Sequence, residues 1–196
     1  MSTNALIIVD LQNDYFVDGR FELVGTDAAA ANAALLLDAA RASGELVIHV
    51  RHEFAGANPP FFAPGSSGAE IHPSVHNEAG EPVILKHQIN SFRDTDLKAT
   101  LDAHGITDLT IAGAMSHMCI DGITRAAVDL GYNATVIHDA VATRDLEFGG
   151  VTVPATQVHA AFMAALSFAY AAVLSTNEYL TKTAAQDFDA EAADGL

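Results

Sequence analysis

Cys119 is the single cysteine of the 196-residue chain, and it follows a strand-like segment at the point where a helix is expected to begin. A thiol at a helix N-terminus faces unpaired backbone N–H groups and the positive end of the helix dipole, and both favour the nucleophilic thiolate. The alternative is a buried free cysteine that packs as a small hydrophobe. Other residues must decide between these two interpretations.

Two further side chains of catalytic type lie at the ends of predicted strands. Asp10 ends the apolar run 4–10 and Lys86 ends the run 82–86, whereas Cys119 follows the run 108–112. In open α/β sheets the functional site forms beyond the carboxyl ends of the strands. We therefore expect an acid, an amine and a thiol to meet at one edge of one sheet.

This set of side chains suits attack on an acyl carbon. A carboxylate within hydrogen-bond reach can take the proton of a thiol, and a nearby lysine favours both anions and restrains the pKa of the acid. The developing oxyanion needs preorganised donors, which the turn 113–119 can supply as backbone N–H groups. Asp10 alone could be a helix cap or turn residue, and Lys86 alone a solvated lysine. Both non-catalytic explanations would have to hold at the same edge of the sheet, so we favour the catalytic interpretation.

A partly aromatic pocket is expected near these residues. The irregular segment 53–80 contains Phe61 and Phe62, and so long a loop in a compact domain is usually functional or disordered. Its phenylalanines favour ordered packing over a pocket, although core packing is the alternative for each aromatic residue. His117 competes with Asp10 as a base, but we place it on the pocket wall because neighbours at such a turn often point apart. The candidates for this wall are Tyr15, Phe16, Phe54, Phe92 and His117.

No metal and no other cofactor is expected. Five histidines are scattered around the second and third predicted strands, and a proline interrupts the single pair with i, i+4 spacing. No HExxH, CxxC or Asp-x-His pattern occurs, and neither GxGxxG nor GxxxxGK[ST] is present. The five histidines are His49, His52, His72, His76 and His87.

Composition indicates a folded protein of a reducing compartment. Half of the residues are hydrophobic and the mean hydropathy is +0.22, while a net charge of -16 argues against nucleic acid and anionic membranes as partners. A lone cysteine excludes an internal disulfide, no positively charged leader precedes the first apolar run, and no apolar stretch reaches membrane-spanning length. We therefore predict a cytoplasmic protein with a small-molecule substrate.

Strand-like and helix-like segments alternate along the chain. Thr26 or Asp27 is the expected N-cap of the first helix. Residues 139–153 are interpreted as a polar loop, and the acidic tail from about residue 178 as a helix or a frayed end. The alternation predicts one α/β domain over residues 1–196 with a mostly parallel sheet. The predicted helices are 26–43, 95–104, 118–130 and 155–171, and the predicted strands are 4–10, 45–51, 82–86, 108–112, 134–138 and 172–175.

The chain resembles the isochorismatase-like cysteine hydrolase superfamily, which includes nicotinamidases, N-carbamoylsarcosine amidohydrolases and ureidoacrylate amidohydrolases. The resemblance extends from about residue 5 to about residue 176. Three segments in this order make it specific. They are ALIIVDLQNDYF at 5–16, LKHQINSF at 85–92 and GAMSHMCIDGITRAA at 113–127.

The resemblance implies a three-layer α/β/α, Rossmann-like fold with six parallel strands. It also implies a triad of Cys119, Asp10 and Lys86 that forms an acyl-thioester, which water then hydrolyses. A cis peptide bond is implied between Ala114 and Met115, with the N–H groups of Met115 and Cys119 as the oxyanion hole. Because proteins of this family commonly form dimers or tetramers, a homo-oligomer is expected.

Two departures from the family pattern bear on the substrate. Metal-binding nicotinamidases carry Asp-x-His after the second strand, where this chain has VRHEF at 50–54, so that metal site and nicotinamide are both in doubt. Isochorismatases proper lack the cysteine nucleophile. We therefore expect an amidohydrolase that cleaves an amide or carbamoyl C–N bond of a small molecule. The alternatives are a non-catalytic or differently specific protein of this fold and a metal-assisted amidase of the nicotinamidase type.

Overall fold

Six parallel strands form the central sheet of the protein, whose computed structural model describes residues 3–56 and 58–194, with side chains up to residue 185. The strand order is β3-β2-β1-β4-β5-β8, and β6 and β7 pair separately as an antiparallel hairpin. The bounds are β1 (Asn4–Val9), β2 (Leu46–His52), β3 (Val83–Lys86), β4 (Asp108–Ala114), β5 (Asn133–Ala142), β6 (Leu146–Phe148), β7 (Val151–Val153) and β8 (Ala172–Leu174).

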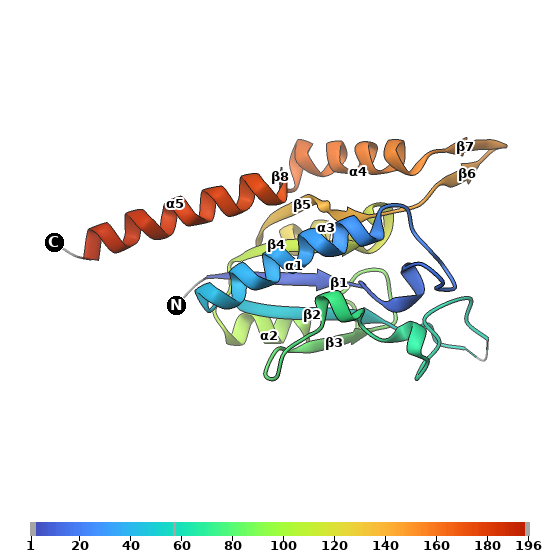
Figure 1. Ribbon diagram of the computed structural model, residues 1–196, viewed down its shortest axis with the longest axis horizontal. Coiled ribbons are helices and arrows are strands. Elements are labelled where there is room, and N and C mark those ends of the chain that lie inside the picture. The colour runs from blue at the N-terminus through green and yellow to red at the C-terminus, as the bar shows by residue number, and fades with distance from the viewer. Residues whose placement is uncertain (1–2, 57, 195–196) are drawn as a thin grey trace.

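Helices cover both faces of the sheet (Figure 1). The first face carries α1 (Thr26–Ser43) and α5 (Thr176–Asp194), and the opposite face carries α2 (Leu97–Ala103), α3 (Asp121–Asp129) and α4 (Ala155–Ala169). The predicted three-layer α/β/α architecture with six parallel strands is therefore confirmed. No helix in the described part of the chain is both long enough and apolar enough to cross a membrane.

The sequence of β1 explains this layering. Leu6 and Ile8 pack into the core beneath α1, whereas Ala5, Ile7 and Val9 pack into the core on the opposite face. Successive side chains of a strand point to opposite faces, so a strand that is apolar at every position is buried on both sides. β1 ends at Val9, and the next residue is Asp10, the acid predicted for the functional site.

The segment 139–153 is not the predicted polar loop. β5 continues to Ala142, and the hairpin of β6 and β7 follows it. The two residues between these strands, Gly149 and Gly150, have φ of 59° and 79°. Positive φ at both central residues is the type I′ geometry that matches the twist of flanking strands. The Gly-Gly pair was thus the sequence signal for a hairpin, and the polar residues beside it concealed that signal.

Two helix starts also differ from the prediction. The N-cap of α1 is Gly25, in the left-handed region, and neither Thr26 nor Asp27 caps it; the Thr26 hydroxyl donates backwards to the Leu23 carbonyl at 3.2 Å. On the other face, α3 begins only at Asp121, after a π-helical turn over Ser116–Ile120. Cys119 therefore lies in that turn and not in the first turn of an α-helix. The acidic tail belongs to α5 and is helical, which is one of the two structures predicted for it.

The close approach of β4 to β1 at Val9 requires a glycine at position 113. A Cβ atom at Gly113 would lie 1.9 Å from the Val9 carbonyl oxygen, whereas one at Gly44 would meet nothing within 4 Å. Both glycines have positive φ, so replacement by alanine strains the backbone at each.

We predict that Gly44→Ala lowers the free energy of unfolding by about 1 kcal/mol and that Gly113→Ala lowers it by at least about 3 kcal/mol or prevents folding. Chemical denaturation of both variants measures the difference. Equal losses at the two positions would contradict the close approach of the two strands.

Candidate active site

The carboxyl ends of β1, β3 and β4 bring the three predicted residues together inside the protein. Nζ of Lys86 lies 2.7 Å from Oδ2 of Asp10 and 3.1 Å from Sγ of Cys119. Asp10 and Lys86 are 0% exposed and Cys119 is 3% exposed. A buried charge is tolerated when it is paired and hydrogen-bonded, and here the lysine contacts both partners. The convergence expected from the strand ends is present.

The backbone turns sharply at two points of the site. Asp10 leaves β1 with φ of 52°, a left-handed conformation that aspartate adopts more readily than most residues, and its N–H donates to the Val50 carbonyl at 2.9 Å. The peptide bond between Ala114 and Met115 is cis, as the resemblance implied. The Asp10 carboxylate and the Cys119 sulfur lie within 4.8 Å of each other.

Lys86 is surrounded by hydrogen-bond acceptors. Besides Asp10 and Cys119, its ammonium contacts Nδ1 of His52 at 2.8 Å and the carbonyl oxygen of Gln88 at 3.2 Å. Burial alone would lower the pKa of Lys86, but the neighbouring Asp10 and Cys119 raise it above its ordinary value. The lysine is therefore charged: its three N–H groups donate to His52, Cys119 and the Gln88 carbonyl, and the charge pairs with Asp10.

The resting cysteine is a thiol. Burial raises the pKa of Cys119 well above its usual range, the Asp10 carboxylate raises it further, and Lys86 opposes both effects. The expectation that a helix N-terminus favours the thiolate is wrong here, because the residue lies in a buried π-helical turn beside a carboxylate. Burial also raises the pKa of Asp10, and the Lys86 charge limits that rise. The site thus holds a neutral nucleophile with a base beside it.

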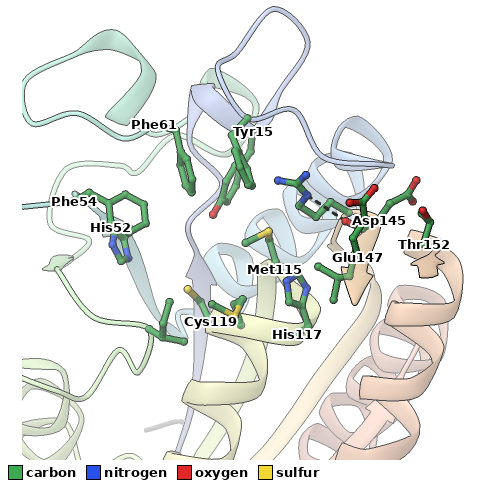
Figure 2. Close-up of a pocket in the computed structure, with 15 residues that line it drawn as sticks. Tyr15, His52, Phe54, Phe61, Met115, His117, Cys119, Asp145, Glu147 and Thr152 are labelled. Carbon is green, nitrogen blue, oxygen red and sulfur yellow. Dashed lines mark hydrogen bonds between the residues drawn. The ribbon is translucent and has the colours of Figure 1, made fainter. Parts of the chain in front are cut away.

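A cavity of about 500 Å³ opens above the thiol (Figure 2). Aromatic rings from the segments after β1 and β2 form one side, and the β6–β7 hairpin forms the other. The residues that line it are Tyr15, Phe21, His52, Phe54, Phe61, Ile89, Met115, His117, Met118, Cys119, Arg144, Asp145, Leu146, Glu147 and Thr152.

Three of the five residues predicted for the pocket wall line this cavity: Tyr15, Phe54 and His117. The other two lie elsewhere. Phe16 stacks on His72 with ring centroids 3.6 Å apart, and Phe92 stacks on the ring of Tyr132 at 6.0 Å. His117 bonds to the Thr143 hydroxyl through Nδ1 at 2.8 Å, so that nitrogen already has a partner.

The phenylalanine-rich segment is held over the cavity by two polar side chains that sequence reasoning did not identify. Gln12 donates through Nε2 to the carbonyls of His52 and Ala69, both at 2.8 Å, and Asp14 accepts from the Phe62 N–H at 2.6 Å. Both polar side chains are buried. Their position within four residues of Asp10, just beyond the end of a buried strand, was the available signal.

The cavity residues from the hairpin were missed for a different reason. The segment 139–153 is interpreted from sequence as a loop, and that interpretation gives no reason to place its residues in the site. Three of the residues in this segment that line the cavity are Arg144, Glu147 and Thr152. The Arg144 guanidinium lies 4.3 Å from the centre of the Phe21 ring, and both residues line the cavity. Recognition of Gly149-Gly150 as a hairpin turn would have predicted the strands β6 and β7.

Comparison with known proteins agrees with this geometry. The isochorismatase domain family matches residues 4–178. The chain is 47% identical over 178 residues to YddQ of Bacillus subtilis, an uncharacterized isochorismatase family protein, covering 91% of this chain and 99% of that one. It is 28% identical over 191 residues to the ureidoacrylate amidohydrolase RutB of Variovorax paradoxus, covering 81% and 74%.

A solved structure from Oleispira antarctica, of a protein assigned to the isochorismatase hydrolases, superposes with a TM-score of 0.89. The two sequences are 60% identical, and the match covers 92% of this chain and 99% of the other. The family match and the solved structure both span most of the chain. This protein therefore belongs to the isochorismatase family of hydrolases.

Proposed function

We propose that this protein is a cysteine amidohydrolase that cleaves an amide or carbamoyl C–N bond of a small molecule through an acyl-thioester on Cys119. The observation that carries the proposal is the buried contact of Lys86 with both Asp10 and Cys119 beside a cavity of about 500 Å³. A cavity of this size suits a small organic molecule. The relative named ureidoacrylate amidohydrolase supports the choice of a C–N bond.

The mechanism starts from the neutral thiol. Asp10 takes the proton of Cys119 while Sγ forms a bond to the acyl carbon, and the proton then passes to the departing nitrogen as the C–N bond breaks. Water, deprotonated by Asp10, next attacks the thioester, and the C–S bond breaks to restore the thiol. One water is consumed, and one carboxylic acid and one amine, or ammonia, are released.

Lys86 and the nucleophile turn stabilise the charges that arise in these steps. The ammonium lies within 3.1 Å of both Asp10 and Cys119, so it favours the thiolate during attack and keeps the carboxylate available as a base. Met115 and Cys119 both line the cavity, and their N–H groups are the proposed donors to the oxyanion. None of these steps requires a cofactor.

Replacement of the nucleophile tests the proposal. We predict that Cys119→Ala lowers kcat/KM by at least about 1000-fold because no other side chain can form the thioester. Ammonia release from a panel of small amides, ureas and carbamoyl compounds supplies the assay. His104→Asn, at an exposed site after α2, is the control and should retain full activity. Turnover by folded Cys119→Ala protein would refute the mechanism.

The pH profile tests Asp10 as the base. A base must be ionised, and because the pKa of Asp10 is raised by burial, its protonated fraction grows as the pH falls. We predict that kcat/KM falls at acid pH with a midpoint above the value of about 3.9 for an exposed aspartate. Asp10→Asn should lower the rate at least about 100-fold and remove this acid limb. An unchanged acid limb in that variant would exclude Asp10 as its origin.

One observation favours the metal-assisted alternative. Asp10, His52 and Cys119 are the group of three metal-ligating side chains found in the described part of the chain, with ligand atoms within 4.8 Å of one another. However, Nζ of Lys86 contacts all three, so an ammonium ion holds the position that a metal ion would take.

We therefore predict that dialysis of the purified protein against a chelator leaves the rate of hydrolysis unchanged, because Lys86 already supplies the positive charge. Activity is measured before dialysis, after it, and after addition of zinc or manganese. A loss that one of these metals restores would support the metal-assisted alternative instead.

A further inference from the structure

His52 is a buried side chain of the site that the mechanism above does not use. It ends β2, is 3% exposed, and its ring lies 4.3 Å from the ring of Phe54 and 6.3 Å from that of Phe62. Its backbone is clamped by Gln12, whose Oε1 accepts from the His52 N–H at 2.7 Å and whose Nε2 donates to the His52 carbonyl at 2.8 Å. The imidazole is thus held in a fixed position on the cavity wall (Figure 2).

The contact with Lys86 fixes the tautomer of His52. An ammonium group has donors and no acceptor, so Nδ1 of His52, which lies 2.8 Å from Nζ of Lys86, must accept. Burial and the Lys86 charge lower the pKa of His52 to about 3, which keeps the ring neutral. The single ring proton of a neutral imidazole is therefore on Nε2.

That Nε2–H is an unsatisfied donor. It is buried, and no atom of the described residues accepts a hydrogen bond from it. An unpaired buried donor destabilises the protein, so a ligand that supplies an acceptor to it is bound more tightly. His52 borders the cavity although Nε2 itself is buried, so a ligand that packs against the ring from the cavity is the available source of that acceptor.

Lys86 cannot perform this task for the substrate. Its three N–H groups already donate to His52, Cys119 and the Gln88 carbonyl, and its charge pairs with Asp10. A substrate oxygen on this side of the cavity therefore has to find another donor. Asp10 is an acceptor when ionised, so among Asp10, Lys86 and His52 the imidazole Nε2–H is the donor without a partner.

We propose that His52 binds the substrate directly, by donating its Nε2–H to a substrate oxygen close to the carbon that Cys119 attacks. This inference rests on the proposed function for the role of Cys119. It narrows the substrates to amides and carbamoyl compounds with a carbonyl or carboxylate oxygen within reach of His52. Sites with a buried donor reject analogues that lack its acceptor, because the donor is then left unpaired.

Alkylation of the single cysteine tests this role without an identified substrate. Iodoacetamide carries a carbonyl oxygen next to the carbon that the sulfur attacks, whereas allyl bromide carries no oxygen. We expect His52→Asn to lower the ratio of the iodoacetamide rate to the allyl bromide rate about tenfold, the loss of one hydrogen bond. The Asn Oδ1 can still accept from Lys86, and any change in thiol acidity affects both reagents and cancels in the ratio.

A second variant guards against a change in folding. Gln places an N–H near the position of Nε2, so His52→Gln should restore most of the ratio, while His104→Asn should leave it at the wild-type value. The inference is overturned if the ratio stays at the wild-type value in folded His52→Asn protein, or if Gln and Asn lower it equally. If His52→Asn lowers the ratio as expected but the wild-type protein hydrolyses no amide, the proposed function is refuted and the donor role of His52 stands.

Discussion

The Lys86 ammonium is the interaction on which the site depends. Removing such a charge from water costs several kcal/mol, and the cost is tolerated only when partners surround the charge. The sheet provides them, because β3 pairs with β2 so that Lys86 lies opposite His52, and β1 delivers Asp10 between β2 and β4. A shift of one residue in any of these pairings would turn the side chain to the other face. The strand register that builds the sheet is therefore also what brings the residues of the site together.

The same burial determines the state of the nucleophile. A sulfur that is 3% exposed beside a carboxylate holds its proton, so reactivity depends on transfer to Asp10 during attack and not on a thiolate formed in advance. Lys86 lowers the free-energy cost of that transfer because it contacts both Sγ of Cys119, which loses the proton, and the Asp10 carboxylate, which gains it. The cavity then limits which acyl carbon can reach the sulfur, with aromatic rings on one side and the hairpin on the other.

The sequence predicted those parts of the structure that depend on local pattern. Apolar runs identified all six strands, both the buried inner strands β1, β2, β4 and β5 and the partly exposed edge strands β3 and β8. The rule of strand ends brought together Asp10, Lys86 and Cys119. The same patterns did not reveal which of two adjacent rings faces the cavity: Tyr15 lines it and Phe16 stacks on His72. That choice depends on a short turn after β1 whose geometry no periodicity encodes.

The remaining errors arose where distant segments decide the outcome. Gln12 and His52 are 40 positions apart, and their mutual hydrogen bonds give both residues a place in the site that neither has in isolation. The thiol pKa likewise follows from burial by several elements, which a helix-start argument omits. The hairpin is the exception, since Gly149-Gly150 was a readable local signal.

The most direct test of the account is the intact mass of the protein quenched with acid during turnover of a cleavable amide. We predict a population heavier by the mass of the substrate acyl group, with the added mass on the peptide that contains Cys119 and no such species in Cys119→Ala protein. Steady turnover with no acyl adduct in the quenched samples, or with an adduct on another residue, would contradict the thioester mechanism.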